Sequence, residues 1–242
     1  VPIDDFAPFI PPAVARRGAG PDLAVATQPA VPRTSGTSPA ASGGPIPEHV
    51  PLPPPSVADG IVERFIQYDL GKLSGDEGAR ARDEFFALGP EAVGPLIRGL
   101  NQAATIGYSC PIVVLNSKLL KCLTDAADPR LDVMAATNLC SGVPRNAPHY
   151  RTAAALRDWC IDRLGPEHPL RRRKERVDVL LAEKDESAID RALKGGDPAE
   201  RLAAVTAAGS LGPRFGRELI AALGDDDRAV RSEAHHELMA LG

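Results

Sequence analysis

The sequence predicts an all-α protein in which paired helices form a right-handed solenoid, preceded by an extended proline-rich arm. Three observations support this class. Of the 24 prolines, 14 lie in the first 58 residues. From position 57 onward, apolar residues recur at three- and four-residue spacing. The helical part also repeats itself at fixed offsets. With 242 residues and 43% hydrophobic residues, the chain can form one large domain and an accessory segment.

Residues 1–56 form the predicted arm. Proline has no backbone donor and restricts the residue before it to extended conformations, so we expect no regular structure there. A disordered linker is one interpretation of such a composition. The first ten residues are more apolar than a solvated linker requires, which favours an arm that lies on a surface. Phe6, Phe9 and Ile10 are then its expected anchors.

Residues 57–242 form the predicted helical domain. Ser74 and Glu77 have the spacing of a capping box, which predicts a helix over 78–88 that ends at Gly89. Pro90 suits the first turn of a second helix that continues to Leu100.

The middle of the domain, residues 105–165, is predicted to be helical but irregular. We expect helices over about 111–126, 129–140 and 148–164, arranged up, down and up. Two helix starts have an aspartate followed by proline, at Asp128 and Asp197. Together the patterns predict about ten helices and no strand.

An internal repeat is the most informative feature of the sequence. Residues 77–90 align without gaps to residues 200–213, an offset of 123, and the register continues from 96–100 to 219–223. A second offset, of 30, places Asp227 on Asp197 and Arg231 on Arg201. A short period of helix, turn and helix is typical of helical solenoids, in which neighbouring units bury their apolar faces together.

Residues 197–242 resemble HEAT repeats of the short bacterial type that is also seen in phycocyanobilin-lyase-like proteins, and residues 77–101 carry a weaker copy. The resemblance rests on Asp197, Ala203, Ala204, Leu211, Gly212, Leu219, Leu223, Asp227, Val230, Arg231, Ala234, Leu241 and Gly242. It implies a solenoid of about five helical pairs. It says little about function, because such solenoids mostly present a surface.

The four cysteines lie in the irregular middle. In the expected up-down-up arrangement, Cys110 is level with Cys140, and Cys122 is level with Cys160. Two disulfides between these pairs are one interpretation, and four buried free thiols are the other. Disulfides would favour an oxidising compartment. A chain that starts at Val1 is compatible with a cleaved signal or with trimming, so we expect export to the periplasm, envelope or exterior slightly more than a cytoplasmic location.

The sequence contains no recognisable catalytic, cofactor or metal motif. No Cys-x-x-Cys pair occurs, and His235 and His236 are adjacent instead of four residues apart. The basic cluster at 171–176 is followed by acidic residues, which favours a solvated helix face over a nucleic-acid patch. A net charge of −4 also disfavours general DNA binding. No apolar run is long enough to cross a membrane.

The function that these patterns favour is a non-catalytic scaffold or accessory subunit that binds protein partners within a larger assembly. The arm and the exposed helix faces would hold the partner. The candidate contact residues on the helices are Glu91, Arg98, Asn101, Arg214, Arg217 and Glu218. The alternative is an enzyme or enzyme-assembly factor, either lyase-like or a HEAT-like DNA glycosylase. A glycosylase would use an aromatic and an acid such as Trp159 and Asp158, but a tryptophan at a helix interface is the simpler interpretation.

Overall fold

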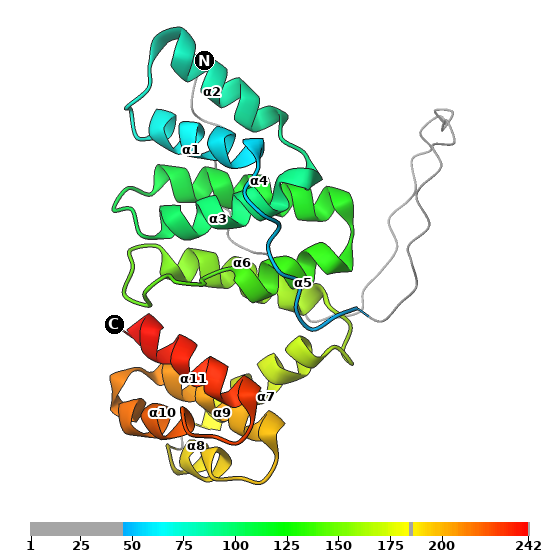
Figure 1. Ribbon diagram of the computed structural model, residues 1–242, viewed down its shortest axis with the longest axis vertical. Helices are drawn as coiled ribbons and strands as arrows, with labels where there is room; N and C mark the ends of the chain where they lie inside the picture. The colour runs from blue at the N-terminus through cyan, green and yellow to red at the C-terminus, as the bar shows by residue number, and fades with distance from the viewer. Residues whose placement is uncertain (1–45, 184–185, 242) are drawn as a thin grey trace, which may run out of the picture. The chain divides into compact units, whose positions relative to one another are not determined.

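The computed structural model describes residues 46–183 and 186–241, and this part of the chain is entirely helical (Figure 1). It contains eleven α-helices, two 3₁₀ helices and no strand among the described residues, which confirms the predicted all-α class. The elements are α1 (Val57–Asp69), α2 (Gly75–Ala87), η1 (Pro90–Ala92), α3 (Val93–Ala104), α4 (Cys110–Ala126), α5 (Pro129–Asn138), α6 (Tyr150–Arg163), α7 (Pro169–Glu183), α8 (Glu186–Leu193), α9 (Pro198–Leu211), η2 (Pro213–Phe215), α10 (Gly216–Ala222) and α11 (Arg228–Leu241).

Two hydrophobic cores lie along residues 46–241. The first is built from α1 to α6, and the second from α8 to α11. Helix α7 joins them, because its Leu170 belongs to the first core and its Val177 to the second. We refer to the two groups of helices as the first block and the second block. Each block buries its own apolar side chains, which is the main stabilising contribution to such helix stacks.

The first block begins with α1, whose N-terminus is fixed by Asp59. The Asp59 carboxylate accepts a hydrogen bond from the Ser56 backbone N–H at 2.6 Å. Farther along, the rings of Phe65 and Phe85 stack with their centroids 3.8 Å apart and join α1 to α2. Ser74 does precede α2, but its side chain forms no capping bond, and the helix begins at Gly75, three residues earlier than the sequence predicts.

The two segments related by the offset of 123 have matching secondary structure. Helices α2 and α9 begin at Gly75 and Pro198, 123 residues apart. The 3₁₀ turns η1 and η2 begin at Pro90 and Pro213, and the same offset separates the starts of α3 and α10. The sequence repeat is therefore also a repeat of helix, 3₁₀ turn and helix.

The offset of 30 is matched by a repeated arginine contact. Helix α11 begins and ends 30 residues after α9. In α9, Nη1 of Arg201 donates to the backbone oxygens of Gly195 and Gly196, both at 3.1 Å. In α11, Nη1 of Arg231 donates to the oxygens of Asp225 and Asp226, at 2.6 and 2.9 Å. These acceptors are 30 residues apart as well, so both arginines hold the loop before their helix in the same way.

Aspartate caps mark three of the predicted helix starts. Asp128 accepts from the Arg130 N–H, Asp197 from the Ala199 N–H, and Asp227 from the Ala229 N–H. The distances are 2.9, 2.9 and 2.8 Å. Each carboxylate satisfies an orphan donor of the first turn, as expected of an N-cap.

The middle helices begin and end close to their predicted limits, but they pack differently. Helix α4 packs chiefly on α3, whereas α5 packs chiefly on α6. Helix α3 lies between α1 and α4: a Cβ at Gly99 would overlap Val62 and also contact Leu115. The expected arrangement, in which α4 and α5 lie side by side along their length, is therefore wrong.

The blocks are also joined by a polar contact away from α7. Arg145, in the loop between α5 and α6, forms an ion pair with Glu237 of α11. The backbone N–H of Arg145 donates to the oxygen of Ala240 at 2.7 Å. Glu237 is only 2% exposed, and the space for its carboxyl group exists because position 209 of α9 is glycine.

Residues 46–56, the described end of the predicted arm, lie outside helices and run along the first block (Figure 1, blue). Val50 and Leu52 are half-buried against the first core, and the other nine residues are exposed. We call residues 46–56 the strap. Separately, no helix in the described ranges has the length and hydropathy that a membrane span requires.

Candidate protein-interaction surface

The candidate residues from the sequence fall into three groups. Phe6, Phe9 and Ile10 lie outside the described residues. Arg98 and Asn101 belong to internal contacts of the first block. The others remain at the surface or near it: Glu91, Arg214, Arg217 and Glu218.

Arg98 of α3 is half-buried and fully engaged, so its expected exposure is wrong. Its Nε and Nη2 donate to the two carboxylate oxygens of Asp59 at 2.6 and 2.9 Å. Its Nη1 donates to the backbone oxygen of Pro53 in the strap at 2.9 Å. The bidentate pair fixes the guanidinium plane and lowers the pKa of Asp59. Arg98 thus joins α1, α3 and the strap.

Asn101, one turn later on α3, is also an internal residue. Its side-chain amide donates to the backbone oxygen of Asn138, and its oxygen accepts from the Cys140 N–H, both at 2.9 Å. These bonds hold the end of α5, where Cys140 has a positive φ of 66°. Asn138 in turn donates to the backbone oxygen of Val50 in the strap.

Helix α10 presents an uncovered apolar face in the second block. Ile220 is 61% exposed and Leu223 is 40% exposed, whereas Leu219 between them in sequence is fully buried. Arg217 and Ala221 are exposed on the same helix. Residues three and four apart on a helix share one face, so Arg217, Ile220 and Ala221 form one exposed stripe. We call this stripe with Leu223 the α10 face.

The corresponding face of α3 is covered. At the offset of 123, Ile220 corresponds to Ile97 and Leu223 to Leu100, and both residues of α3 are fully buried. Helix α3 packs against α1, α4, α5 and α6, and the strap crosses it at Gly94 and Arg98. Helix α10 packs on α9 and α11, with a smaller contact to α8. The α10 face therefore lacks, within the described residues, the cover that its counterpart receives.

Charged residues flank the α10 face. Arg214 forms an ion pair with Glu186 of α8 at 2.5 Å and lies over the ring of Phe215, 5.5 Å from its centroid. Glu218 is half-buried, and its Oε2 is a buried atom that has no hydrogen-bond partner among the described residues. Glu91, at the corresponding turn of the first block, accepts from the Gly89 N–H at 2.9 Å.

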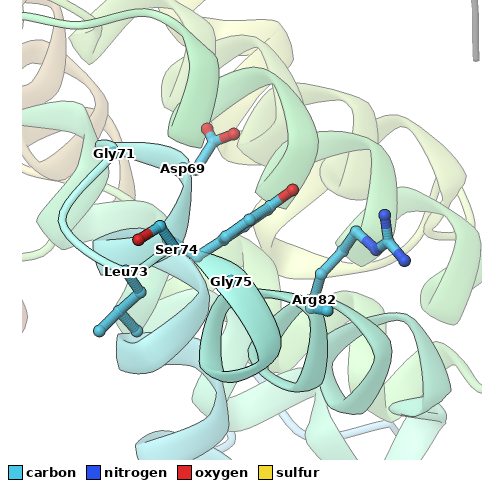
Figure 2. Close-up of a pocket in the computed structure, with 8 residues that line it drawn as sticks. Asp69, Gly71, Leu73, Ser74, Gly75 and Arg82 are labelled. Carbon is cyan, nitrogen blue, oxygen red and sulfur yellow. The ribbon is translucent and has the colours of Figure 1, made fainter.

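A small polar hollow of about 550 Å³ lies at the turn between α1 and α2 (Figure 2). Its labelled lining residues come from the end of α1, the turn and α2, and include Asp69, Ser74 and Arg82. Burial raises the pKa of Asp69, and its Oδ2 has no hydrogen-bond partner in the described part of the chain. Arg82 pairs with its neighbour Asp83. This set can hold a small polar molecule, but it has no nucleophile paired with a base.

All four cysteines are free thiols in the structure, so neither of the disulfides considered from the sequence is present. Cys110 is exposed at the start of α4, while Cys140 is buried beyond α5. Because α4 and α5 pack on different helices, these two residues are not brought level as the up-down-up arrangement would require. Cys122 and Cys160 are buried, and the Cys122 thiol donates to the Gly89 oxygen at 3.5 Å.

The basic cluster at the start of α7 is largely neutralised by carboxylates. Its ion pairs join Arg171 to Asp162 and Glu175, Arg172 to Glu167, Lys174 to Asp162 and Asp178, and Arg176 to Asp197. Trp159 packs partly buried against the first core, with the Arg163 guanidinium 4.6 Å above its ring. These contacts give the cluster and the tryptophan structural partners, which a DNA-binding groove would need to leave accessible.

No family model, curated protein or solved structure matches the chain. Among the residues that the structure describes, no group of three or more histidine, cysteine or acidic side chains is placed to hold a metal ion.

Sequence reasoning missed the side chains that bind the strap. His168 lies just before α7 and Asn138 ends α5, and both contact residues more than 85 positions earlier in the chain. Neither has a recognisable motif around it. The only sequence signal was the density of prolines in the strap itself.

Proposed function

We propose that this chain is a HEAT-like solenoid scaffold that binds a protein partner through the α10 face. The matching helix limits at offsets of 123 and 30 support the solenoid assignment. The repeated arginine contacts of Arg201 and Arg231 support it as well, because they place the same bonds at the same position of two successive helices.

One observation carries the binding proposal. Ile220 and Leu223 are exposed where the equivalent Ile97 and Leu100 are fully buried by other helices of the same chain. Apolar side chains at these positions gain free energy when they are covered, by about 25 cal/mol for each Å² removed from water. The first block thus indicates what the α10 face accommodates: a packed protein segment with an apolar side.

The partner we propose is an apolar or amphipathic helix, because helix α3 is covered mainly by other helices. The small side chain at Ala221 allows a helix to approach closely between Arg217 and Ile220. Arg217 would then lie at the edge of the contact, where a partner carboxylate can reach it. The arm, with Phe6, Phe9 and Ile10, remains a proposed second contact that would strengthen binding by linkage.

Affinity capture from an extract of the cells that produce the protein tests this proposal. We expect the native chain to retain a partner that the double variant Ile220→Asp, Leu223→Asp loses. The matched control is Val179→Asp, since Val179 is similarly exposed at 57% but lies on α7. Both variants alter exposed side chains, so their melting temperatures should stay close to that of the native chain. Retention of the same proteins by the native chain and the double variant would contradict the proposal.

A further inference from the structure

The strap is held by three side chains that each bind one of its backbone oxygens. Arg98 Nη1 donates to the oxygen of Pro53 at 2.9 Å. Asn138 Nδ2 donates to the oxygen of Val50 at 2.9 Å. The Nε2 of His168 lies 3.3 Å from the oxygen of Pro47.

The three bound oxygens are spaced by three residues. A polyproline II helix has three residues per turn and no internal hydrogen bonds, so every third carbonyl points to the same side. Residues 47, 50 and 53 therefore present their oxygens to one surface, and the three donors lie along that surface. Within the described residues, no backbone N–H of residues 46–55 donates a hydrogen bond.

Each donor is oriented by a second contact. The Asp59 carboxylate holds the other edge of Arg98. The backbone oxygen of Asn138 accepts from Asn101, which fixes the end of α5. The Leu170 N–H donates to Nδ1 of His168 at 3.3 Å. In a neutral ring, an accepting Nδ1 leaves the hydrogen on Nε2, so His168 is a donor toward Pro47.

The strap also fits a seat for a proline ring. Position 94 of α3 is glycine, and a Cβ there would lie 2.7 Å from Cγ of Pro53. Only Val50 and Leu52 are half-buried, and the remaining strap side chains are exposed. Recognition thus depends on main-chain oxygens, on one proline ring and on two modest apolar contacts.

We infer that Arg98, Asn138, His168 and Gly94 form a binding groove for polyproline II segments, which the chain's own strap occupies and which a proline-rich segment of a partner protein can enter in its place. The contacts to backbone oxygens do not depend on side-chain identity, so any segment of this conformation can make them. The largely exposed strap has few contacts to lose on exchange. The groove lies on the first block and does not depend on the α10 face.

The probe for this inference is a fluorescent peptide with the sequence of residues 46–56. In the native chain the tethered strap competes with it at a high effective concentration. In the full chain carrying Val50→Gly, Leu52→Gly and Pro53→Gly, the strap loses its apolar contacts and its proline seat. We expect fluorescence anisotropy to show at least tenfold tighter probe binding by this strap variant than by the native chain.

Two controls identify the groove. Adding Asn138→Ala to the strap variant should weaken probe binding at least threefold, whereas adding Asn146→Ala, at an exposed loop position, should leave it unchanged. A probe with all its prolines replaced by glycine should bind at least tenfold more weakly. Equal binding by the strap variant and the native chain, or equal binding of the two probes, would overturn the inference.

A second measurement applies to the native chain, in case the strap variant does not fold. A probe with a photo-crosslinking residue in place of its leucine should crosslink to α3 or α5, and excess unlabelled peptide should suppress the product. Crosslinks to other helices alone would contradict the groove. Dimerisation of the native chain that the peptide reverses would make a second copy the occupant and overturn the assignment to a partner protein.

Discussion

Glu237 is the residue whose environment differs most from water. It is 2% exposed, and its carboxyl group occupies the space above Gly209 while it pairs with Arg145. Burial raises the pKa of Glu237 to about 7, although Arg145 acts in the opposite direction. Because this pair joins the two blocks, the charge of one side chain influences how firmly they are joined.

The pH dependence of stability tests this assignment. The pKa of Glu237 is higher in the folded chain than in the unfolded one, so the folded state binds this proton more tightly. Its contribution is therefore complete below about pH 4.5 and is lost as the pH rises through 7. Each unit corresponds to about 1.4 kcal/mol, so we expect the free energy of unfolding to fall by about 3 kcal/mol across this range. Urea unfolding at several pH values measures it.

The matched variants are Glu237→Gln and Glu200→Gln. Glutamine at 237 cannot ionise, so the decline between pH 4.5 and 7 should largely disappear. Glu200 is exposed on α9, and its replacement should preserve the decline. An unchanged pH profile in Glu237→Gln would show that another group is responsible.

Residues with local roles could be predicted from the sequence, and residues with distant partners could not. The caps at Asp128, Asp197 and Asp227 bind amides two residues later, so a short motif contains the whole interaction. Arg98 and Asn101 carry no such sign. Their partners lie 37 to 45 positions away, and charged or polar side chains on a helix are ordinarily assigned to its exposed face.

At the scale of the elements, the repeated arginines show how successive helices are linked. Arg201 and Arg231 both hold the loop before their own helix. Arg201 also reaches the next loop, where its Nε and Nη2 bind Asp225 at 2.8 and 2.9 Å and its Nη2 binds Asp226 at 2.7 Å. This pairing lowers the pKa of Asp225 to about 2. Arg201 thus connects three consecutive segments.

The two arginines provide a matched pair of variants. Arg201→Ala removes the loop contact and the link to the next loop, and it leaves Asp225 without its counter-ion. For Arg231, only the loop oxygens are partners among the described residues. We therefore expect Arg201→Ala to lower the urea midpoint more than Arg231→Ala does. An equal decrease would show that the link to Asp225 and Asp226 adds no stability.

The limits of the elements were predictable where breakers and caps punctuate the chain. Pro90 and Pro213 open the 3₁₀ turns, and prolines or aspartates mark several helix starts. The packing of α4 and α5 was not predictable, because helix periodicity shows which face is apolar but does not identify the helix that covers it. The disulfide pairs failed for this reason, since they assumed a neighbour relation that the structure does not have.

At the scale of the whole described chain, two similar units have different surroundings. The helix pairs α2–α3 and α9–α10 correspond in sequence and in secondary structure. The first pair lies within a block of six helices and carries the strap, while Ile220 and Leu223 of the second remain exposed. The repeat itself was visible in the sequence because it is a local pattern. The difference in cover was not, because the aligned apolar residues are the same type in both copies.

Site-specific photo-crosslinking at position 220 is the most direct test of the proposed scaffold function. The full chain would carry the crosslinking residue at Ile220 or, as the control, at Val179, and would be irradiated in an extract of the cells that produce it. We expect a discrete protein adduct at 220 that is absent at 179 and is suppressed by Leu223→Asp. The same adducts at both positions, or none at 220, would contradict the account, because an α10 face that binds a partner must lie within reach of it.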